Sequence, residues 1–263
     1  MRLDADALRS GLAGKRIGWP LHCFETVDST NRVAMRLARE GAAEGTAVLA
    51  DGQTDGKGRL RRGWQSPPGC NLYLSVILRP ALAVPEISRI TLLAGVAAAE
   101  TIASACPQGG VGIKWPNDVR IRGRKACGIL AETSPAGGSQ VVVLGIGMNV
   151  NIRRRDFDPG HRNSATSLLE ETGKVQSREA LACLLCGRLD QWYATFMGEG
   201  FPPVREAWMQ RSDMTGKRVR VLFRNEVKEG TATGIDLDGA LILAGPQGEI
   251  LRIVAGDATI LKE

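Results

Sequence analysis

Histidine is scarce in this chain, which has two histidines in 263 residues. Neither His22 nor His161 stands in an HExxH sequence or in a recognisable serine, histidine and acid arrangement, so the sequence predicts neither a zinc peptidase nor a triad hydrolase. The Walker spacing GxxxxGK[ST] is absent, and no GxGxxG segment follows an expected strand and opens a helix. The sequence therefore does not predict a P-loop or a dinucleotide-binding Rossmann site.

Cysteines and long apolar runs are also few. Six cysteines are too sparse and irregular for the disulfide framework of a small secreted protein. The first residues mix acids with bases and contain no apolar core, unlike a secretory signal peptide. The richest apolar stretch, 90–106, is interrupted by polar residues and is shorter than the roughly 20 apolar residues that a bilayer requires. We therefore expect a cytoplasmic protein without a membrane span.

The overall composition is that of an ordinary globular protein. Hydrophobic residues make up 43% of the chain and charged residues 24%. The formal net charge is +6 and the pI is about 9.2. A basic balance suits an anionic partner, which leaves a nucleotide, a nucleic acid and an acidic protein open.

Residue patterns predict an α+β fold with a mixed sheet in the first part of the chain. Helical spacing of apolar residues predicts a helix that starts at Ser29-Thr30-Asn31, an apolar helix around 87–97, and a long helix along 181–196. Strand-like segments lie at 46–50, 71–78, 111–119, 127–133 and 141–150. The segment 51–69 is predicted to be a long basic loop, and 153–165 to be irregular.

The residue pattern changes near Met214, after which short strand-like segments alternate with turns such as Asp238-Gly239. We expect a catalytic domain over 1–213 and a small β-barrel over 214–263. The barrel segment from 216 onward has seven basic and seven acidic residues. The positive excess of the chain therefore lies in its first part.

The first chemically unusual segment is GKGRLRRGW at 56–64, which we call the glycine loop. Its glycines expose backbone N–H groups among four cations, and a tryptophan ends it, which suits a phosphate and a stacked base. A solvated basic turn is about equally consistent with these residues taken alone.

Two further segments look functional. KWPNDV at 114–119, followed by Lys125 and Gly128, gathers two lysines, an amide and a carboxylate around a Trp-Pro pair. GIGMNVN at 145–151 interrupts an apolar strand with glycines, which indicates a close ligand or, nearly as well, a β-bulge. By contrast, Cys183 and Cys186 lie in a leucine-rich helical pattern without a second pair, so we interpret them as core residues.

Taken in order, DSTN at 28–31, Gln53 with the glycine loop, KWPNDV with Lys125 and Gly128, and GIGMNVN resemble the bacterial biotin protein ligases, also called biotin-[acetyl-CoA-carboxylase] ligases. The resemblance runs from about Phe24 to the end of the chain. It implies a mixed sheet with helices, related to lipoate ligases and class II aminoacyl-tRNA synthetases, with a C-terminal SH3-like β-barrel. It also implies that ATP converts biotin to biotinyl-5′-AMP, which then biotinylates a lysine of a biotin carboxyl carrier domain.

The resemblance also implies roles for individual residues. The catalytic set is Arg59, Lys114, Asp118 and Lys125, with Asp118 as a base for the incoming lysine. The biotin set is Ser29, Thr30, Asn31, Gln53, Gly56, Lys57, Gly58, Arg59, Lys125, Gly128 and Gly145. The nucleotide set is Arg59, Arg61, Arg62, Trp64, Lys114, Asn117, Lys125 and Asn149. Magnesium is expected to be held mostly by phosphates, with Asn149 as its protein ligand.

The chain departs from the family pattern in the glycine loop, which usually reads GRGRxGRxW. Lys57 stands at the first arginine and lacks its planar fork. Arg61 stands at the third glycine, where a side chain is expected to change how the loop orders around the adenylate. About 23 residues precede the match, too few for the winged helix-turn-helix of many relatives, so we expect a short form without specific DNA binding.

Two other functional classes remain as alternatives. A lipoate ligase shares the fold and the adenylation chemistry, but its acid has no ureido group to require the polar set at 29–31 and 53. A nucleic-acid-binding module would use the net charge and the barrel, yet the barrel segment offers few aromatics for stacking bases. The sequence leaves open whether the chain is a monomer or a homodimer, and which carrier protein it modifies.

Overall fold

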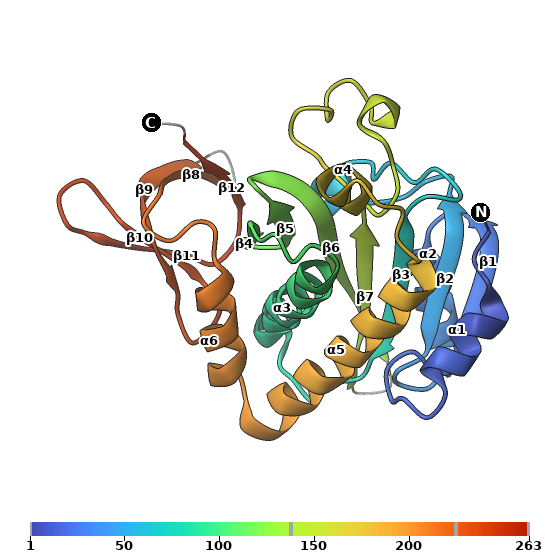
Figure 1. Ribbon diagram of the computed structural model, residues 1–263. Helices are drawn as coiled ribbons and strands as arrows, with labels where there is room; N and C mark the ends of the chain where they lie inside the picture. The colour runs from blue at the N-terminus through green and yellow to red at the C-terminus, as the bar shows by residue number, and fades with distance from the viewer. Residues whose placement is uncertain (1, 137–138, 224–225, 262–263) are drawn as a thin grey trace.

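In a computed structural model, residues 2–136, 139–223 and 226–261 are described. The first part of the chain forms a seven-stranded sheet with the order β1-β2-β3-β7-β6-β5-β4 (Figure 1). Strands β1 and β2 are parallel and the other neighbours are antiparallel, so the sheet is mixed, as expected. The strands are β1 (Leu21–Val27), β2 (Ala47–Gln53), β3 (Leu72–Leu78), β4 (Val111–Lys114), β5 (Asp118–Ile121), β6 (Arg124–Ala136) and β7 (Ser139–Met148).

Helices cover both faces of this sheet. The helices are α1 (Ala5–Leu12), α2 (Thr30–Arg39), α3 (Ser88–Ala105), α4 (Leu168–Thr172), α5 (Arg178–Glu199) and α6 (Pro202–Arg211). Helices α3 and α5 pack on one face and on each other, while α2 packs on the other face against β2, β3 and β7. The α2 face has its own small apolar core, in which Val33 and Ala34 meet Ile77 and Val143.

The apolar helix expected around 87–97 is α3, and it is a core helix. Together with the short turn before it, Pro85–Ala105 is long and apolar enough to cross a membrane by length and composition alone, and it is the one such helix among the described residues. In the folded chain, 67% of its most apolar window is buried between the sheet and neighbouring helices. The burial of side chains such as Ile90, Leu93 and Ala97 accounts for its composition.

The C-terminal part forms a five-stranded antiparallel sheet with the order β11-β10-β9-β8-β12, consistent with the expected SH3-like barrel. Its strands are β8 (Arg218–Phe223), β9 (Glu226–Ile235), β10 (Leu241–Ala244), β11 (Ile250–Ile253) and β12 (Asp257–Ile260). The expected turn at Asp238-Gly239 joins β9 to β10, and Gly239 has a φ of 81°, which glycine adopts readily.

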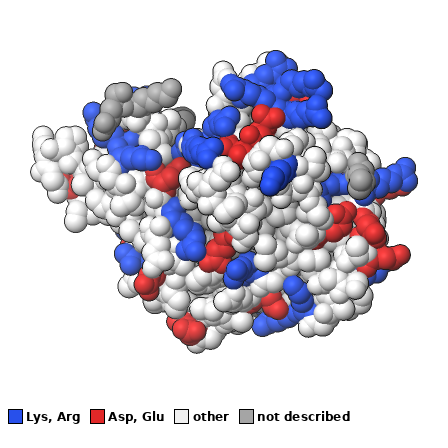
Figure 2. Space-filling model, viewed as in Figure 1, with Lys and Arg blue, Asp and Glu red and all other residues white. Residues whose placement is uncertain are grey.

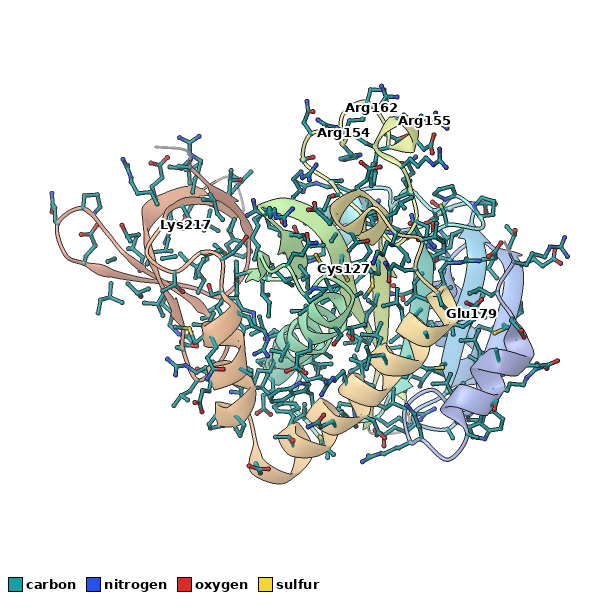
Figure 3. All side chains as sticks on the ribbon, viewed as in Figure 1. Cys127, Arg154, Arg155, Arg162, Glu179 and Lys217 are labelled. Carbon is teal, nitrogen blue, oxygen red and sulfur yellow. The ribbon has the colours of Figure 1, made fainter. Side chains whose placement is uncertain are left out.

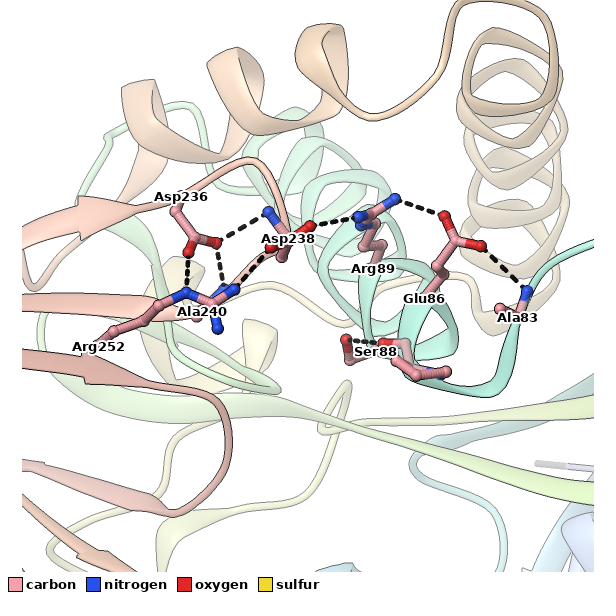
Figure 4. A network of polar contacts seen from close by, with 9 residues as sticks. Ala83, Glu86, Ser88, Arg89, Asp236, Asp238, Ala240 and Arg252 are labelled. Carbon is pink, nitrogen blue, oxygen red and sulfur yellow. Dashed lines mark hydrogen bonds and ion pairs between the residues drawn. The ribbon is translucent and has the colours of Figure 1, made fainter.

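Polar contacts attach the barrel to the first part of the chain. Arg89 at the start of α3 pairs with Asp238 of the barrel at 2.7 Å, and Asp238 also pairs with Arg252 at 2.7 Å (Figure 4). Trp115 Nε1 donates to the carbonyl oxygen of Gly239 at 3.0 Å. These contacts hold the turn between β9 and β10 against the start of α3 and the loop that follows β4.

Some elements depart from the sequence expectations. The patterns do not predict α1 or β1, because β1 is an edge strand with three exposed residues in a row and therefore lacks a clear alternation. The helix expected along 181–196 is α5, which is longer than expected and runs from Arg178 to Glu199. On α5, Cys186 is buried among apolar side chains, as interpreted, and burial raises the pKa of its thiol to about 12.

Candidate active site

A cavity of about 580 Å³ lies where the ends of β2, β6 and β7 meet the glycine loop and the barrel strand β12. Its size is typical of sites for small ligands. The segment after β7 forms a lobe beside it, drawn at the top of Figure 1, and Figure 3 labels Arg154, Arg155 and Arg162 on that lobe. Figure 2 shows lysine and arginine side chains concentrated there.

Most of the predicted site residues line this cavity. Those that do are Ser29, Thr30, Asn31, Gln53, Lys57, Gly58, Arg59, Arg62, Trp64, Lys114, Asn117, Asp118, Lys125, Gly128, Gly145 and Asn149. Gly56 and Arg61 do not line it. The tertiary fold thus brings together four sequence blocks that lie up to about 120 residues apart, a separation that loop closure makes costly unless many contacts reward it.

Buried polar side chains form one end of the cavity, which we call the floor. Thr30 and Asn31 begin α2, and Gln53 ends β2, so the sheet and the helix present them side by side. Gln53 Oε1 accepts from the backbone N–H of Thr30 at 2.9 Å. Behind them Ser75 of β3, which the sequence reasoning missed, contacts Thr30 Oγ1 at 2.8 Å and Asn31 Oδ1 at 2.6 Å.

Gly145 is required by its contact with the floor. A Cβ atom at this position would overlap the Asn31 side-chain amide, so any larger residue would displace Asn31. The glycines of the strand segment 145–147 therefore make room for neighbouring side chains, whereas the sequence indicates a close ligand or a β-bulge.

The glycine loop reaches the barrel through its arginines. Arg59 donates to Asn117 Oδ1 at 3.1 Å and to the carbonyl oxygen of Gly256 at 3.0 Å, and its guanidinium lies 3.4 Å from Asp257 Oδ1. Arg62 pairs with Asp257 Oδ2 at 2.7 Å. Asp257 is a site residue that the sequence reasoning missed, because it lies about 200 residues away in a segment without a motif.

Arg61 lies outside the cavity and is exposed, and its place among the nucleotide contacts stays a prediction. Leu60 and Arg61 have φ values of 54° and 59°, in the left-handed region that glycine adopts without steric cost. This backbone explains why glycine is usual at the position of Arg61 and turns the chain so that Arg61 faces solvent. Gly56 acts through packing, since a Cβ there would lie 2.6 Å from the carbonyl oxygen of Trp64.

Trp64 lies flat against the sheet. A Cβ at Gly147 would lie 2.5 Å from its indole ring, and one at Gly128 would lie 3.0 Å away. Lys125 Nζ sits 5.3 Å from the centre of a ring of Trp64, within range of a cation–π contact. Glycine is therefore needed on both strands to seat the indole.

Lys114, Asp118 and Lys125 form a charged cluster at the other end of the cavity. Lys125 Nζ lies 2.6 Å and Lys114 Nζ 3.8 Å from the carboxylate of Asp118. Burial lowers the pKa of Lys114, an effect that the nearby Asp118 partly opposes. Asn117 is fixed by its donation to the carbonyl oxygen of Ile129 at 2.7 Å. One carboxylate between two ammonium groups leaves a net positive region suited to an anion.

Asn149 is buried, and its amide donates to the carbonyl oxygen of Thr166 at 3.1 Å. Its side-chain oxygen is the remaining polar group for a ligand. Cys127 lies close by on β6 (Figure 3), but burial raises the pKa of its thiol to about 12, which makes it a poor nucleophile. His161 and Phe157 of the lobe also line the cavity, although the sequence suggests no role for them.

This combination of a mixed sheet, a neutral polar floor and a cationic far end defines an enzyme of the acyl-adenylating ligase class. Residues 23–149 match the model of the biotin/lipoate A/B protein ligase family, and residues 215–260 match the biotin protein ligase C terminal domain. The chain belongs to the biotin protein ligases of this family.

Curated relatives agree with this assignment. The bifunctional ligase/repressor BirA of Bacillus subtilis is 36% identical over 97% of this chain and 78% of the relative. The biotin--[acetyl-CoA-carboxylase] ligase of Mycobacterium tuberculosis is 34% identical over 99% of this chain and 96% of the relative. The structure of the Aquifex aeolicus biotin protein ligase in complex with biotin and ATP has a TM-score of 0.80 and 28% identity, and covers 92% of this chain and 99% of that one.

Proposed function

We infer that this chain is an ATP-dependent biotin ligase, which activates biotin to biotinyl-5′-AMP and transfers the biotinyl group to a lysine of a biotin carboxyl carrier domain. The observation that carries this conclusion is the two-ended cavity. Neutral hydrogen-bonding groups at the floor suit a ureido head, and the lysines and arginines at the far end suit a carboxylate and phosphates.

In the first step the biotin carboxylate attacks the α-phosphorus of ATP, an O–P bond forms, and the bond to pyrophosphate breaks. Two anions must approach each other, so positioning and cationic stabilisation are the main requirements. We propose that Arg59 and Lys125 hold the biotin carboxylate and the α-phosphate. Arg62 and Lys57 also line the cavity, and we propose that they meet the outer phosphates.

The floor residues Ser29, Thr30, Asn31 and Gln53 are proposed to hydrogen-bond the ureido group, while Gly58, Gly128 and Gly145 allow a close approach. Trp64, Lys114, Asn117 and Asn149 are proposed to contact the nucleotide. Magnesium would be held mainly by the phosphates, with the Asn149 side-chain oxygen as one protein ligand, since the described residues contain no cluster of three acidic, histidine or cysteine side chains.

In the second step the lysine amine of the carrier attacks the acyl carbon, the bond to AMP breaks, and the ammonium must first lose a proton. We propose Asp118 as the acceptor of that proton. Its contact with Lys125 supports a second role, orienting that ammonium in the first step. An Asp118→Ala enzyme that forms and transfers the adenylate at full rate would exclude both roles.

A test of the function uses purified protein with biotin, ATP and Mg²⁺, and lipoate in a parallel reaction, analysed for acyl-adenylate and pyrophosphate by mass spectrometry. We expect biotinyl-adenylate with biotin only, and biotin transfer when a biotin carboxyl carrier domain is added. Lipoyl-adenylate would overturn the substrate, and folded protein that makes neither product would overturn the activity.

Location and assembly are also proposals. We propose that the enzyme acts in the cytoplasm, does not enter a membrane, does not bind a specific DNA sequence, and is able to form a homodimer. Supporting the DNA proposal, the barrel segment is electrically balanced. Sedimentation with and without biotin and ATP tests whether the dimer forms. A gel-shift experiment with random DNA as the comparison tests sequence-specific DNA binding.

A further inference from the structure

The floor of the cavity is backed by a carboxylate that does not itself line it. Asn31 Nδ2 donates to Glu132 Oε2 at 2.7 Å, and also lies 3.4 Å from the carbonyl oxygen of Leu130. Glu132 lies on β6 and is half-buried. Ser75, which is fully buried, joins Asn31 to Thr30. A continuous chain of polar contacts thus runs from Glu132 to the part of the floor that faces a ligand.

Glu132 fixes the orientation of the Asn31 amide. A carboxylate and a backbone carbonyl only accept hydrogen bonds, so the NH₂ group of Asn31 must face both of them. Its Oδ1 atom then faces Ser75 at 2.6 Å and must accept there. The reversed amide would set two oxygens against the Glu132 carboxylate and the Leu130 carbonyl, which is unfavourable in a buried site.

Along this series of polar contacts, the floor has one proton fewer than it has contacts to close. Three oxygen-to-oxygen contacts link Asn31 to Ser75, Ser75 to Thr30, and Thr30 to Gln53, at 2.6, 2.8 and 3.1 Å. The Asn31 and Gln53 oxygens cannot donate, so these contacts share the two protons of Ser75 and Thr30. The Ser75 proton closes the contact with Asn31 Oδ1, and the Thr30 proton closes the contact with Gln53 Oε1. The contact between the Ser75 and Thr30 hydroxyl oxygens is therefore left without a proton.

At the other end of this series of polar contacts, the orientation of the Gln53 amide is also fixed. Gln53 Nε2 donates to Ser66 Oγ at 2.9 Å, and Ser66 Oγ donates to the carbonyl oxygen of Trp64 at 2.9 Å. Gln53 therefore keeps its oxygen toward Thr30. Both amides are held with their oxygens toward the hydroxyls of Ser75 and Thr30. A ligand that brings an N–H donor therefore completes the floor, and a ligand that brings only acceptors or apolar atoms does not.

We propose that Glu132 is a positioning residue that, through Asn31 and Ser75, makes the floor an acceptor and thereby selects an acid with N–H donors over one without them. This inference rests on the proposed function and adds to it the group that sets biotin over lipoate. Glu132 does not touch the ligand. It acts by excluding the reversed orientation of Asn31.

Glu132→Gln tests the proposal, because glutamine has the same shape and is able to donate. Glutamine keeps an oxygen that is able to accept, so the polar floor itself must favour the reversal. When the new side-chain amide donates, Asn31 reverses and loses only its 3.4 Å contact with the Leu130 carbonyl, while its NH₂ group supplies the missing proton to Ser75. All three contacts are then closed, and the floor no longer accepts from a ligand. We expect the Kd for biotin to rise about tenfold, the cost of roughly one hydrogen bond, with the KM for ATP and the melting temperature nearly unchanged.

Glu100→Gln is the control, because Glu100 is also a half-buried carboxylate that accepts an N–H, from Trp192 at 3.0 Å, and it lies on α3 away from the floor. Glu100 also pairs with Arg211 at 3.1 Å, so this control removes an ion pair as well as a charge. We expect this variant to bind biotin like the unaltered protein. An equal loss of affinity in both variants would show a general effect of removing a charge and would overturn the proposal.

A double-mutant cycle with Ser75→Ala separates relay from simple proximity. Removing Ser75 cuts the chain between Asn31 and Thr30, so Glu132→Gln should then change the Kd for biotin by less than about twofold. The same loss in both backgrounds would overturn the relay. If the unaltered protein binds no biotin, the proposed function fails; if it binds biotin and Glu132→Gln binds equally well, only this inference fails.

Discussion

The C-terminal barrel holds the glycine loop through Asp257, and replacing this residue by asparagine tests how firmly. Asp257 is the first residue of β12, and it pairs with Arg59 at 3.4 Å and with Arg62 at 2.7 Å. Both arginines belong to the loop that we expect to meet the phosphates. In the ligand-free protein, a carboxylate of the barrel therefore stands where an anionic ligand is expected to compete.

The two ion pairs differ in strength. The Arg62 side chain is 71% exposed, and Asp257 Oδ2 accepts no hydrogen bond from the described residues, so this pair is worth a few tenths of a kcal/mol. In the other pair, the side chains of Arg59 and Asp257 are 27% and 24% exposed, so this pair stabilises the closed loop by about 1 kcal/mol. Losing both weakens the closed loop by about 1 to 1.5 kcal/mol and raises its open fraction about 5- to 10-fold.

Limited digestion with trypsin measures that fraction, because the loop contains Lys57, Arg59, Arg61 and Arg62. When the loop closes faster than trypsin cleaves, the cleavage rate follows the open fraction. We expect Asp257→Asn to be cut in the loop about 5- to 10-fold faster, with its melting temperature nearly unchanged.

The control is Glu229→Gln, which breaks a 2.6 Å pair with Arg220 in the same barrel, away from the loop. We expect this variant to be cut like the unaltered protein. An unchanged loop cleavage rate in Asp257→Asn, or the same increase in Glu229→Gln, would refute the reasoning.

Three other substitutions give distinct outcomes. Gly145→Ala displaces Asn31, so calorimetry should show biotin affinity about tenfold lower or worse, and unaltered affinity would contradict the packing argument. Because burial lowers the pKa of Lys114, its positive charge is lost at a lower pH than for an ordinary lysine. The KM for ATP should therefore begin to rise at a pH below the ordinary lysine pKa of about 10.4, and should stay flatter in Lys114→Arg, whose charge persists. Arg61→Gly relieves a left-handed residue and should raise the free energy of unfolding by about 0.5 to 1 kcal/mol, or a few degrees in Tm; a lower Tm would count against strain at this position.

The groups that we propose to touch a ligand were easier to predict than the groups that orient them. Thr30, Asn31 and Gln53 stand in recognisable blocks, and the structure places them side by side at the floor. Ser75 and Glu132 lie inside strand-like segments whose pattern is that of ordinary strands, and no local signal marks them. Their importance comes from neighbours on other elements, which a single sequence does not display.

The sequence by itself determined the fold class, the barrel texture after Met214 and the four blocks of the site, because periodicity, turn residues and short motifs are local properties. Only the tertiary structure decided that Arg61 faces solvent, that Asp257 meets the glycine loop, and that Glu132 orients Asn31. Each of these depends on backbone geometry or on contacts between residues far apart in the chain. Local pattern does not encode such contacts, because packing of the whole sheet and barrel sets which side chains meet.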